Sequence, residues 1–273
     1  MKQTSWSLRF AKVAFVLVAM VACQEEVPRS DRFVPEDDGV LSSEAGATLL
    51  VEKFTGQRCI NCPAGAKLLH KLGEEYPNRM ITVAHHAASS RLTLPELESE
   101  ASEMYAKALV SSSLSLPGVI LSRRKFFGSR LYSTARGEWS GKVKEALRTP
   151  RSYRIALKAK ATTSRDIELT TSVEAVQPSM HRLMLQIWVV EDMWGKQLGE
   201  GGGDGYHHEH VMRGYLNGAW GQEIALPYLG RETYTLPLQV VSPANAKVVA
   251  FVYDTETREV YEVSITPISG IEA

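Results

Sequence analysis

Hydrophobic and polar positions follow two different periods along the chain, and the change from one to the other falls near Pro150. Before it, short apolar runs at 48–54 and 80–84 predict strands, and apolar residues at helical spacing predict a helix over 63–76. A second apolar stripe predicts another helix over 95–110. Strands and helices that alternate in this way are typical of an α/β layer architecture.

Three further elements complete this first region. The residues at 117–121 predict a turn that leads into a strand, and those at 126–132 predict an edge strand. Apolar residues from Trp139 to Leu147 predict a helix that ends before Pro150. The predicted order is therefore β-α-β-α-β-β-α, which we assign to one α/β domain.

After Pro150 the helical period disappears. Six runs, several of them alternating in polarity, predict strands at 153–161, 167–175, 182–190, 233–241, 247–253 and 259–265. We therefore expect residues 151–273 to form an all-β sandwich of the immunoglobulin-like type. A chain of 273 residues has room for two domains.

The N-terminal segment has the pattern of a secretory signal. Three basic residues precede a short apolar stretch, which is well under the roughly 18 to 20 apolar residues that a transmembrane helix needs. Small residues then lead directly to Cys23, and this arrangement resembles the lipobox of bacterial lipoproteins. The resemblance implies that residues 1–22 are a signal peptide and that Cys23 carries a lipid anchor in the membrane. The polar, acidic residues 23–45 are then a flexible tether.

The charge balance argues against nucleic acid as a partner. The chain contains 31 basic and 31 acidic residues, and its formal net charge is zero. Nucleic-acid-binding proteins normally show a basic excess or a basic stripe. The glycine-rich run at 199–205 neither follows a clear strand nor opens a helix, so it is no phosphate loop. We expect no cofactor.

Candidate chemistry is concentrated in the stretch TGQRCINCPAG, which contains Cys59 and Cys62. Because lipidation accounts for the third cysteine, these two form the remaining pair. A CxxC that follows a strand and begins a helix places Cys59 near unpaired backbone N–H groups, which stabilise a thiolate. Cys59 would attack a substrate disulfide, and Cys62 would resolve the mixed disulfide.

Other interpretations of these motifs stay open. The cysteine pair could be a static disulfide, although so short a loop gains little entropic stabilisation. A zinc site at the pair needs about four ligands, and the chain has no second CxxC. His207, His208 and His210 could hold a transition metal, or they could instead hydrogen-bond the backbone of a loop.

Several of these features together resemble the thioredoxin fold: the strand TLLVEKF, the cysteine pair with its trailing proline, and a later proline before a strand. The resemblance implies that Pro117 lies beside the CxxC and orients the substrate backbone. It also makes Glu52 the nearest match to the buried acid that accepts a proton from the resolving cysteine, although one extra residue separates it from Cys59. Arg58 stands where thioredoxins have an aromatic residue.

A more specific match covers nearly the whole mature chain. The motifs VEKFTGQRCINCPAG, SLPGVILSRR, YHHEHVMRGYLNGAWGQEI and KVVAFVYDTETREVYEV resemble those of the outer-membrane-protein-28-related lipoproteins. That resemblance implies a thioredoxin-like domain at 46–150 and a β-sandwich at 151–273, in a lipoprotein of the Gram-negative cell envelope.

Two functions of different classes are consistent with these observations. One is thiol–disulfide exchange on extracytoplasmic proteins, carried out by Cys59 and Cys62 with help from Pro117 and Glu52. The alternative is a non-enzymatic, surface-exposed adhesion or interaction lipoprotein, in which the disulfide is structural and the partners are surface ligands. Both place the protein at the outer membrane, facing either the periplasm or the cell surface.

Overall fold

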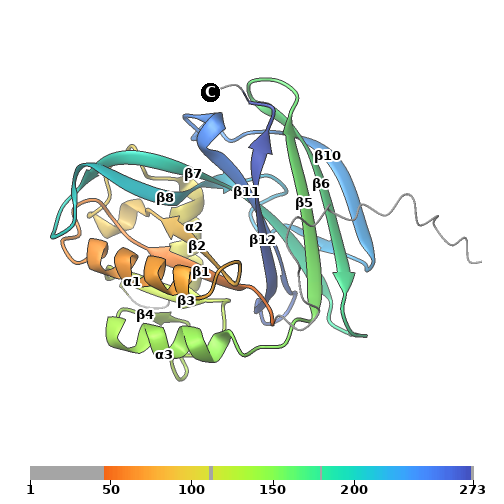
Figure 1. The fold of residues 1–273 in the computed structure, drawn as a ribbon, viewed down its shortest axis with the longest axis horizontal. Coiled ribbons are helices and arrows are strands. Elements are labelled where there is room, and N and C mark those ends of the chain that lie inside the picture. Colours follow the sequence, from red (N-terminus) through yellow and green to blue (C-terminus); the bar gives the residue numbers. More distant parts are fainter. Residues whose placement is uncertain (1–45, 111–112, 179, 272–273) are drawn as a thin grey trace, which may run out of the picture. The chain divides into compact units, whose positions relative to one another are not determined.

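The computed structural model describes residues 46–110, 113–178 and 180–271. The predicted signal peptide, Cys23 and the predicted tether lie outside the described residues, so the lipid anchor stays a prediction. The described residues, drawn in colour in Figure 1, all belong to one compact unit. No helix among them is long and apolar enough to cross a bilayer.

The first half of the described chain alternates strands and helices, as the sequence predicts. Its elements are β1 (Leu49–Phe54), α1 (Cys62–Glu75), β2 (Met80–His85), η2 (Ala88–Ser90), α2 (Glu100–Leu109), β3 (Gly118–Leu121), β4 (Tyr132–Ser133) and α3 (Arg136–Ala146). Strand β1 is central here, because it pairs in parallel with β2 and antiparallel with β3.

Two predicted boundaries in this half are wrong. Helix α2 begins at Glu100 rather than at Pro95, because the side chain of Ser99 accepts a hydrogen bond from the backbone N–H of Ser102 and caps the helix there. The predicted edge strand over 126–132 is reduced to the short strand β4 at the end of that range.

The second half consists of strands and one short 3₁₀ helix. They are β5 (Tyr153–Ala161), β6 (Asp166–Ala175), β7 (Leu183–Gln197), β8 (Gly203–Tyr215), β9 (Gln222–Ile224), β10 (Tyr228–Thr235), η3 (Pro243–Asn245), β11 (Ala246–Asp254) and β12 (Val260–Ser269). Strands β8 and β9 were not predicted, and β10 lies earlier than the predicted run at 233–241.

The strands of both halves belong to one mixed sheet. Its order is β10-β6-β5-β12-β11-β7-β8-β2-β1-β3-β4, and β9 pairs with β7. Strand β8 makes the connection, since it pairs antiparallel with β7 and in parallel with β2, where Ala84 lies opposite Val211. The predicted fold class, an α/β thioredoxin-like domain followed by an all-β immunoglobulin-like sandwich, is therefore wrong. The division of the chain at residue 150 stays a prediction.

Strand β11 gives the physical reason why the strands of the two halves do not form separate cores. Its residues Val249, Phe251 and Tyr253 face one hydrophobic cluster, and the alternating residues Val248 and Val252 face another. The first cluster also contains residues of β1, β2 and α2. The N-terminal half thus covers the face of β11 that a sandwich would leave to solvent.

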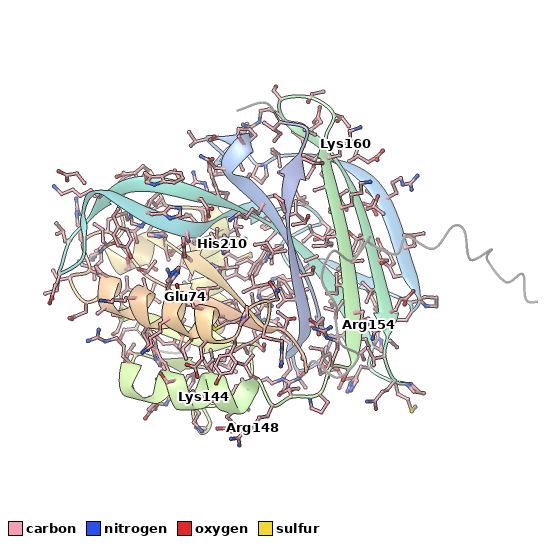
Figure 2. All side chains as sticks on the ribbon, viewed as in Figure 1. Glu74, Lys144, Arg148, Arg154, Lys160 and His210 are labelled. Atoms are coloured by element: carbon pink, nitrogen blue, oxygen red, sulfur yellow. A yellow bond between two sulfur atoms is a disulfide. The ribbon has the colours of Figure 1, made fainter. Side chains whose placement is uncertain are left out.

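Strand β1 is also buried on both faces. Leu50 and Phe54 belong to the cluster shared with β11, whereas Leu49 and Val51 belong to a third cluster, which includes residues of α1, β3 and α3. Charged residues of these helices that include Glu74 of α1 and Lys144 of α3 are exposed (Figure 2). Consecutive residues of β1 therefore meet two different environments, and this positions the candidate site.

Candidate functional site beside the cysteine pair

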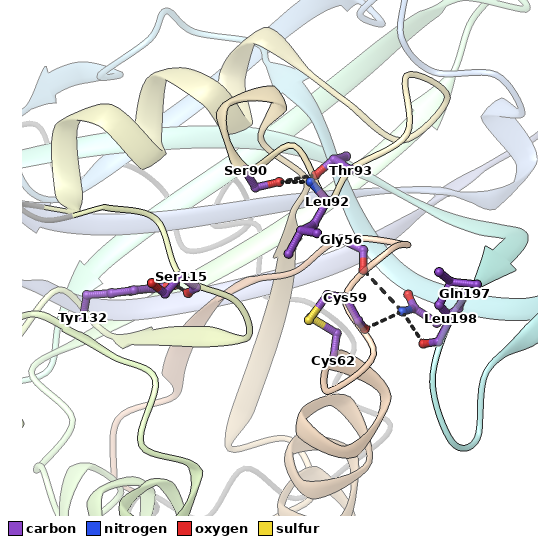
Figure 3. Close-up of a disulfide and its surroundings, with 10 residues drawn as sticks. All are labelled: Gly56, Cys59, Cys62, Ser90, Leu92, Thr93, Ser115, Tyr132, Gln197 and Leu198. Carbon is purple, nitrogen blue, oxygen red and sulfur yellow. Dashed lines mark hydrogen bonds between the residues drawn. A yellow bond between two sulfur atoms is a disulfide. The ribbon is translucent and has the colours of Figure 1, made fainter.

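Cys59 and Cys62 form a disulfide at the start of α1, with their Cα atoms 5.4 Å apart (Figure 3). Both residues are buried, at 4% and 2% relative exposure. Ile60, which lies between them, is 65% exposed. The tip of the loop is thus open to solvent, while the cysteines themselves are covered.

The turn between β7 and β8, residues 198–202, holds the cysteine loop on one side. The backbone N–H of Leu198 donates to the carbonyl oxygen of Gln57 at 2.7 Å. The side-chain amide of Gln197 donates to the carbonyl oxygens of Gly56 and Cys59, at 3.3 and 3.1 Å (Figure 3). These three bonds tie the backbone of the loop to the β7–β8 turn.

Gly199 brings this turn into direct contact with the loop. A Cβ atom at Gly199 would lie 2.1 Å from the carbonyl oxygen of Ile60, and the φ angle of Gly199 is +101°. Both the space and the backbone angle therefore require glycine here. Gly201, in the same turn, also has a positive φ of +79°, but a Cβ there would meet nothing within 4 Å.

A second segment holds the loop on another side. The backbone N–H of Arg58 donates to the carbonyl oxygen of Leu92 at 2.8 Å, and the N–H of Leu94 donates to the side-chain oxygen of Gln57 at 2.9 Å. Two segments that are distant in sequence thus hydrogen-bond the loop that carries Cys59.

Pro117 lies against α1, one turn beyond the disulfide. The Leu116–Pro117 peptide is cis, and a Cβ atom at Gly65 would lie 3.2 Å from Cγ of Pro117. Nearby, the hydroxyl of Tyr132 donates to the carbonyl oxygen of Ser115 (Figure 3). The role of Pro117 in orienting a substrate backbone stays a prediction.

Glu52 lies on the opposite face of β1 from α1, in line with Leu50 and Phe54. It is fully buried, and its carboxylate accepts two hydrogen bonds from the guanidinium of Arg123, at 3.0 and 3.2 Å. The Nε2 atom of His85 lies 3.7 Å from the same carboxylate. The role of Glu52 as proton acceptor for the cysteines stays a prediction, and its contacts with Arg123 and His85 do not support that role.

Arg123 is the centre of a buried cluster that the sequence did not reveal. Its guanidinium carbon lies between 5.1 and 5.7 Å from the ring centres of Tyr105, Trp188, Trp220, Phe251 and Tyr253. Burial and the nearby Arg123 charge lower the pKa of His85 to about 3, so this imidazole is neutral. The cluster is an internal structural centre, because its two charged groups neutralise each other away from solvent.

On the α1 side of the sheet lies a cleft of about 780 Å³. Its lining comes from β1, β2, the first turns of α1, the start of α3, the β7–β8 turn and β8, and the exposed turn at Ile60 and Asn61 lines it as well. The charged and other polar side chains that line it include Lys53, Lys67, His70, Arg136, Glu200, Tyr206, His207 and Glu209. We call this cleft the α1–β8 groove.

Lys53 is the residue of this groove that the sequence reasoning missed. Burial lowers the pKa of its amine to about 8, and the charge of Glu209 opposes that shift. The signal that could have revealed it is the charged pair Glu52–Lys53 inside an apolar strand. Because side chains alternate along a strand, one of the two had to point toward each face.

The three histidines of β8, His207, His208 and His210, make different contacts. His207 stacks on Trp194, with ring centres 4.5 Å apart, and His208 is buried against His86. Nδ1 of His210 lies 3.0 Å from a backbone carbonyl oxygen of β2. Across the residues that the structure describes, no group of three His, Cys, Asp or Glu side chains could hold a metal ion.

Comparison with protein families identifies the class of protein. The family model described as outer membrane protein Omp28 matches residues 111–269, which is more than half of the chain. The chain therefore belongs to the Omp28 family. The resemblance drawn from the sequence motifs is confirmed at this level, and so is the outer-membrane location. No curated protein matches the chain.

Two solved structures from Porphyromonas gingivalis are similar to this chain. HBP35 matches 85% of the chain and 78% of its own length at a TM-score of 0.64 and 18% identity, which shows a shared fold. A domain of the outer membrane lipoprotein Omp28 is 30% identical over 43% of this chain and 88% of that domain, at a TM-score of 0.35. The family indicates an outer-membrane protein, while the lipid anchor and the side of the membrane that the protein faces stay predictions.

Proposed function

We propose that this outer-membrane protein is a non-enzymatic binding protein, that the α1–β8 groove is its binding site, and that the Cys59–Cys62 disulfide supports the rim of that groove. The observation that carries the proposal is the burial of both cysteines, on a loop that hydrogen bonds tie to the β7–β8 hairpin. Thiol–disulfide exchange requires a thiolate to reach a sulfur atom in line, and a covered disulfide resists this attack.

The size and lining of the groove support a binding role. Small-molecule sites commonly occupy roughly 300 to 1,000 Å³ and combine apolar walls with a few polar groups, and this groove has about 780 Å³. Three large apolar side chains around the cysteine loop and the β7–β8 hairpin are exposed: Ile60 at 65%, Trp194 at 59% and Leu198 at 40%. Exposed apolar groups beside a polar cleft are typical of interaction surfaces.

The disulfide has a clear role in such a site. Ile60 and Asn61 line the groove and lie between the two cysteines. Both residues are exposed at a loop tip, where chains are otherwise mobile. The disulfide and the bonds from Gln197 fix this turn, so that the site needs less ordering when a ligand binds.

Thiol–disulfide exchange is the second candidate function. The observation that favours it is the position of Cys59 and Cys62 at the first turn of α1, with Pro117 packed on the same helix. A helix N-terminus stabilises a thiolate. This function requires the loop to open and expose the buried sulfur atoms before each exchange.

A turnover measurement separates the two candidates. Full-length wild-type protein and the Cys59→Ser/Cys62→Ser double variant are mixed with a fluorescent peptide disulfide in a glutathione buffer. We expect equal rates of exchange for the two proteins. A wild-type rate more than about tenfold above that of the double variant would establish exchange and overturn the binding proposal.

A further inference from the structure

Lys53 occupies an unusual position for a lysine. It lies in the middle of the sheet, where Ala84 of β2 and Val119 of β3 flank it in register. Its side chain is on the same face as Leu49 and Val51, which is the face that α1 covers. The amine therefore reaches the α1–β8 groove from its floor rather than from its rim.

The surroundings of Lys53 favour the neutral amine near pH 8. Burial lowers its pKa to about 8, and Glu209 is the carboxylate that opposes this shift. Burial, and after it neighbouring charges that include Lys53, lower the pKa values of His86 and His208. A partly buried lysine with a free electron pair is a nucleophile toward carbonyl carbon.

We propose that Lys53 is a reversible covalent anchor for a small ligand that carries an aldehyde or ketone group and enters the α1–β8 groove. The inference rests on the proposed binding role of the groove and names its ligand class. The amine nitrogen attacks the carbonyl carbon and a C–N bond forms. The carbonyl oxygen then leaves as water with the two amine protons, and an imine remains. Hydrolysis reverses the step, and nothing is oxidised or reduced.

The same groove contains groups that can move these protons. The Nδ1 atom of His70 lies 3.6 Å from one carboxylate oxygen of Glu209, and the Nδ1 atom of His207 lies 3.8 Å from the other. All three side chains are between 40% and 57% exposed. Imidazole and carboxylate groups are the usual general acids and bases when water leaves a tetrahedral carbon.

Lys67 provides a matched control inside the same protein. It lines the same groove from α1 but is exposed. At pH 7.5 an amine with a pKa of about 8 is neutral on the order of a hundredfold more often than an ordinary exposed lysine. Its lower basicity offsets part of this advantage, so we expect Lys53 to form imines about tenfold faster than Lys67.

The test is reductive trapping. Full-length protein is incubated at pH 7.5 with glyoxylate and cyanoborohydride, and the modified lysines are quantified by peptide mass mapping. We expect Lys53 to be labelled about tenfold faster than Lys67 in the folded protein, and at the same rate in denaturant. The variant Lys53→Arg, which keeps the positive charge, should lose this fast labelling and leave the labelling of Lys67 unchanged.

Labelling of Lys53 at or below the rate of Lys67 in the folded protein would overturn the inference. That result would not affect the outcome of the thiol–disulfide exchange assay. The proposed binding function would fail only if that assay showed that the wild type turns over the peptide disulfide. Conversely, fast labelling of Lys53 combined with exchange turnover would retain the reactive amine and overturn the non-enzymatic role.

Discussion

Glu52 and Lys53 are neighbours on β1, yet their side chains lie in different environments on opposite faces of the sheet. Glu52 points into a buried centre, where both of its oxygens accept hydrogen bonds from Arg123. Lys53 points to the other face and lines a groove that is open to solvent, with Glu209 as its main source of opposite charge. Because side chains alternate along the strand, the carboxylate of Glu52 lies in the core and supports the fold. The amine of Lys53 faces the groove, where a ligand can reach it.

The buried centre joins the two halves of the chain. Glu52 comes from β1 and Arg123 follows β3, whereas the rings of Trp188 and Phe251 come from β7 and β11. Removing one charge would leave the other buried without a partner, which is far more costly than the pair itself. The groove contains no comparable constraint, so its charged residues can be changed at a smaller cost in stability.

The largest effect is expected from Arg123→Met. This change leaves the carboxylate of Glu52 buried and unpaired, and we expect the free energy of unfolding to fall by about 3 to 5 kcal/mol. Urea denaturation followed by circular dichroism measures it. A loss below about 1 kcal/mol would show that the pair is not the centre that the structure indicates.

Two further variants keep this prediction testable if Arg123→Met fails to fold. The double variant Glu52→Leu/Arg123→Met removes both charges, and it should recover most of the lost stability. Arg182→Ala breaks an ion pair with Glu223 whose side chains are both exposed, and it should leave stability unchanged within error.

A smaller effect is expected from loss of the disulfide. Cys59 and Cys62 close a loop of only four residues, so the chain-entropy model gives about 2 kcal/mol for Cys59→Ser/Cys62→Ser. Urea midpoints of the oxidised wild type and the double variant measure the difference. An unchanged midpoint would mean that the pair does not stabilise the loop, which would remove the structural role that we assign to it.

A further effect concerns the pH dependence of stability. Because the pKa of Lys53 is lowered to about 8 in the folded state, the unfolded chain binds more protons between about pH 8 and 10.4. The wild type therefore gains stability as the pH rises through that window. We expect Lys53→Met to be more stable than the wild type at pH 7, and this advantage to shrink as the pH rises from about 8.

Urea midpoints of both proteins at several pH values between 7 and about 10 provide this comparison. Lys67→Met is the matched control, and its difference from the wild type should not follow the same window. A constant difference between Lys53→Met and the wild type would indicate that the amine of Lys53 is not desolvated by the groove.

Local periodicity predicted most of the elements. The apolar runs of β1, β2, β5 and β11 and the helical stripe of α1 all lie where the sequence indicates. Strand β8 was missed because its first residues are glycine-rich and polar, and such a composition is typical of loops. Since β8 carries the connection between the halves, missing it led directly to the wrong fold class.

The run VVAFVY in β11 contained the information that this strand is buried on both faces. An apolar run without alternation indicates a strand that is buried on both faces, which a two-layer sandwich with one solvated face does not provide. The cysteine pair could be found from its spacing. Arg123 could not, because the sequence SRRK resembles a solvated basic run until the fold places it among aromatic rings.

The central claim is that the buried Cys59–Cys62 disulfide resists attack because the β7–β8 turn fixes its loop. The most direct test is the rate at which dithiothreitol reduces this disulfide in native wild-type protein, in Gly199→Ala and in Gly201→Ala. Both glycines have positive φ angles, but only at Gly199 would a Cβ atom collide with the loop. We predict slow reduction in the wild type and in Gly201→Ala, and reduction at least about tenfold faster in Gly199→Ala. Rapid reduction of the wild type, with no further increase in Gly199→Ala, would contradict the account.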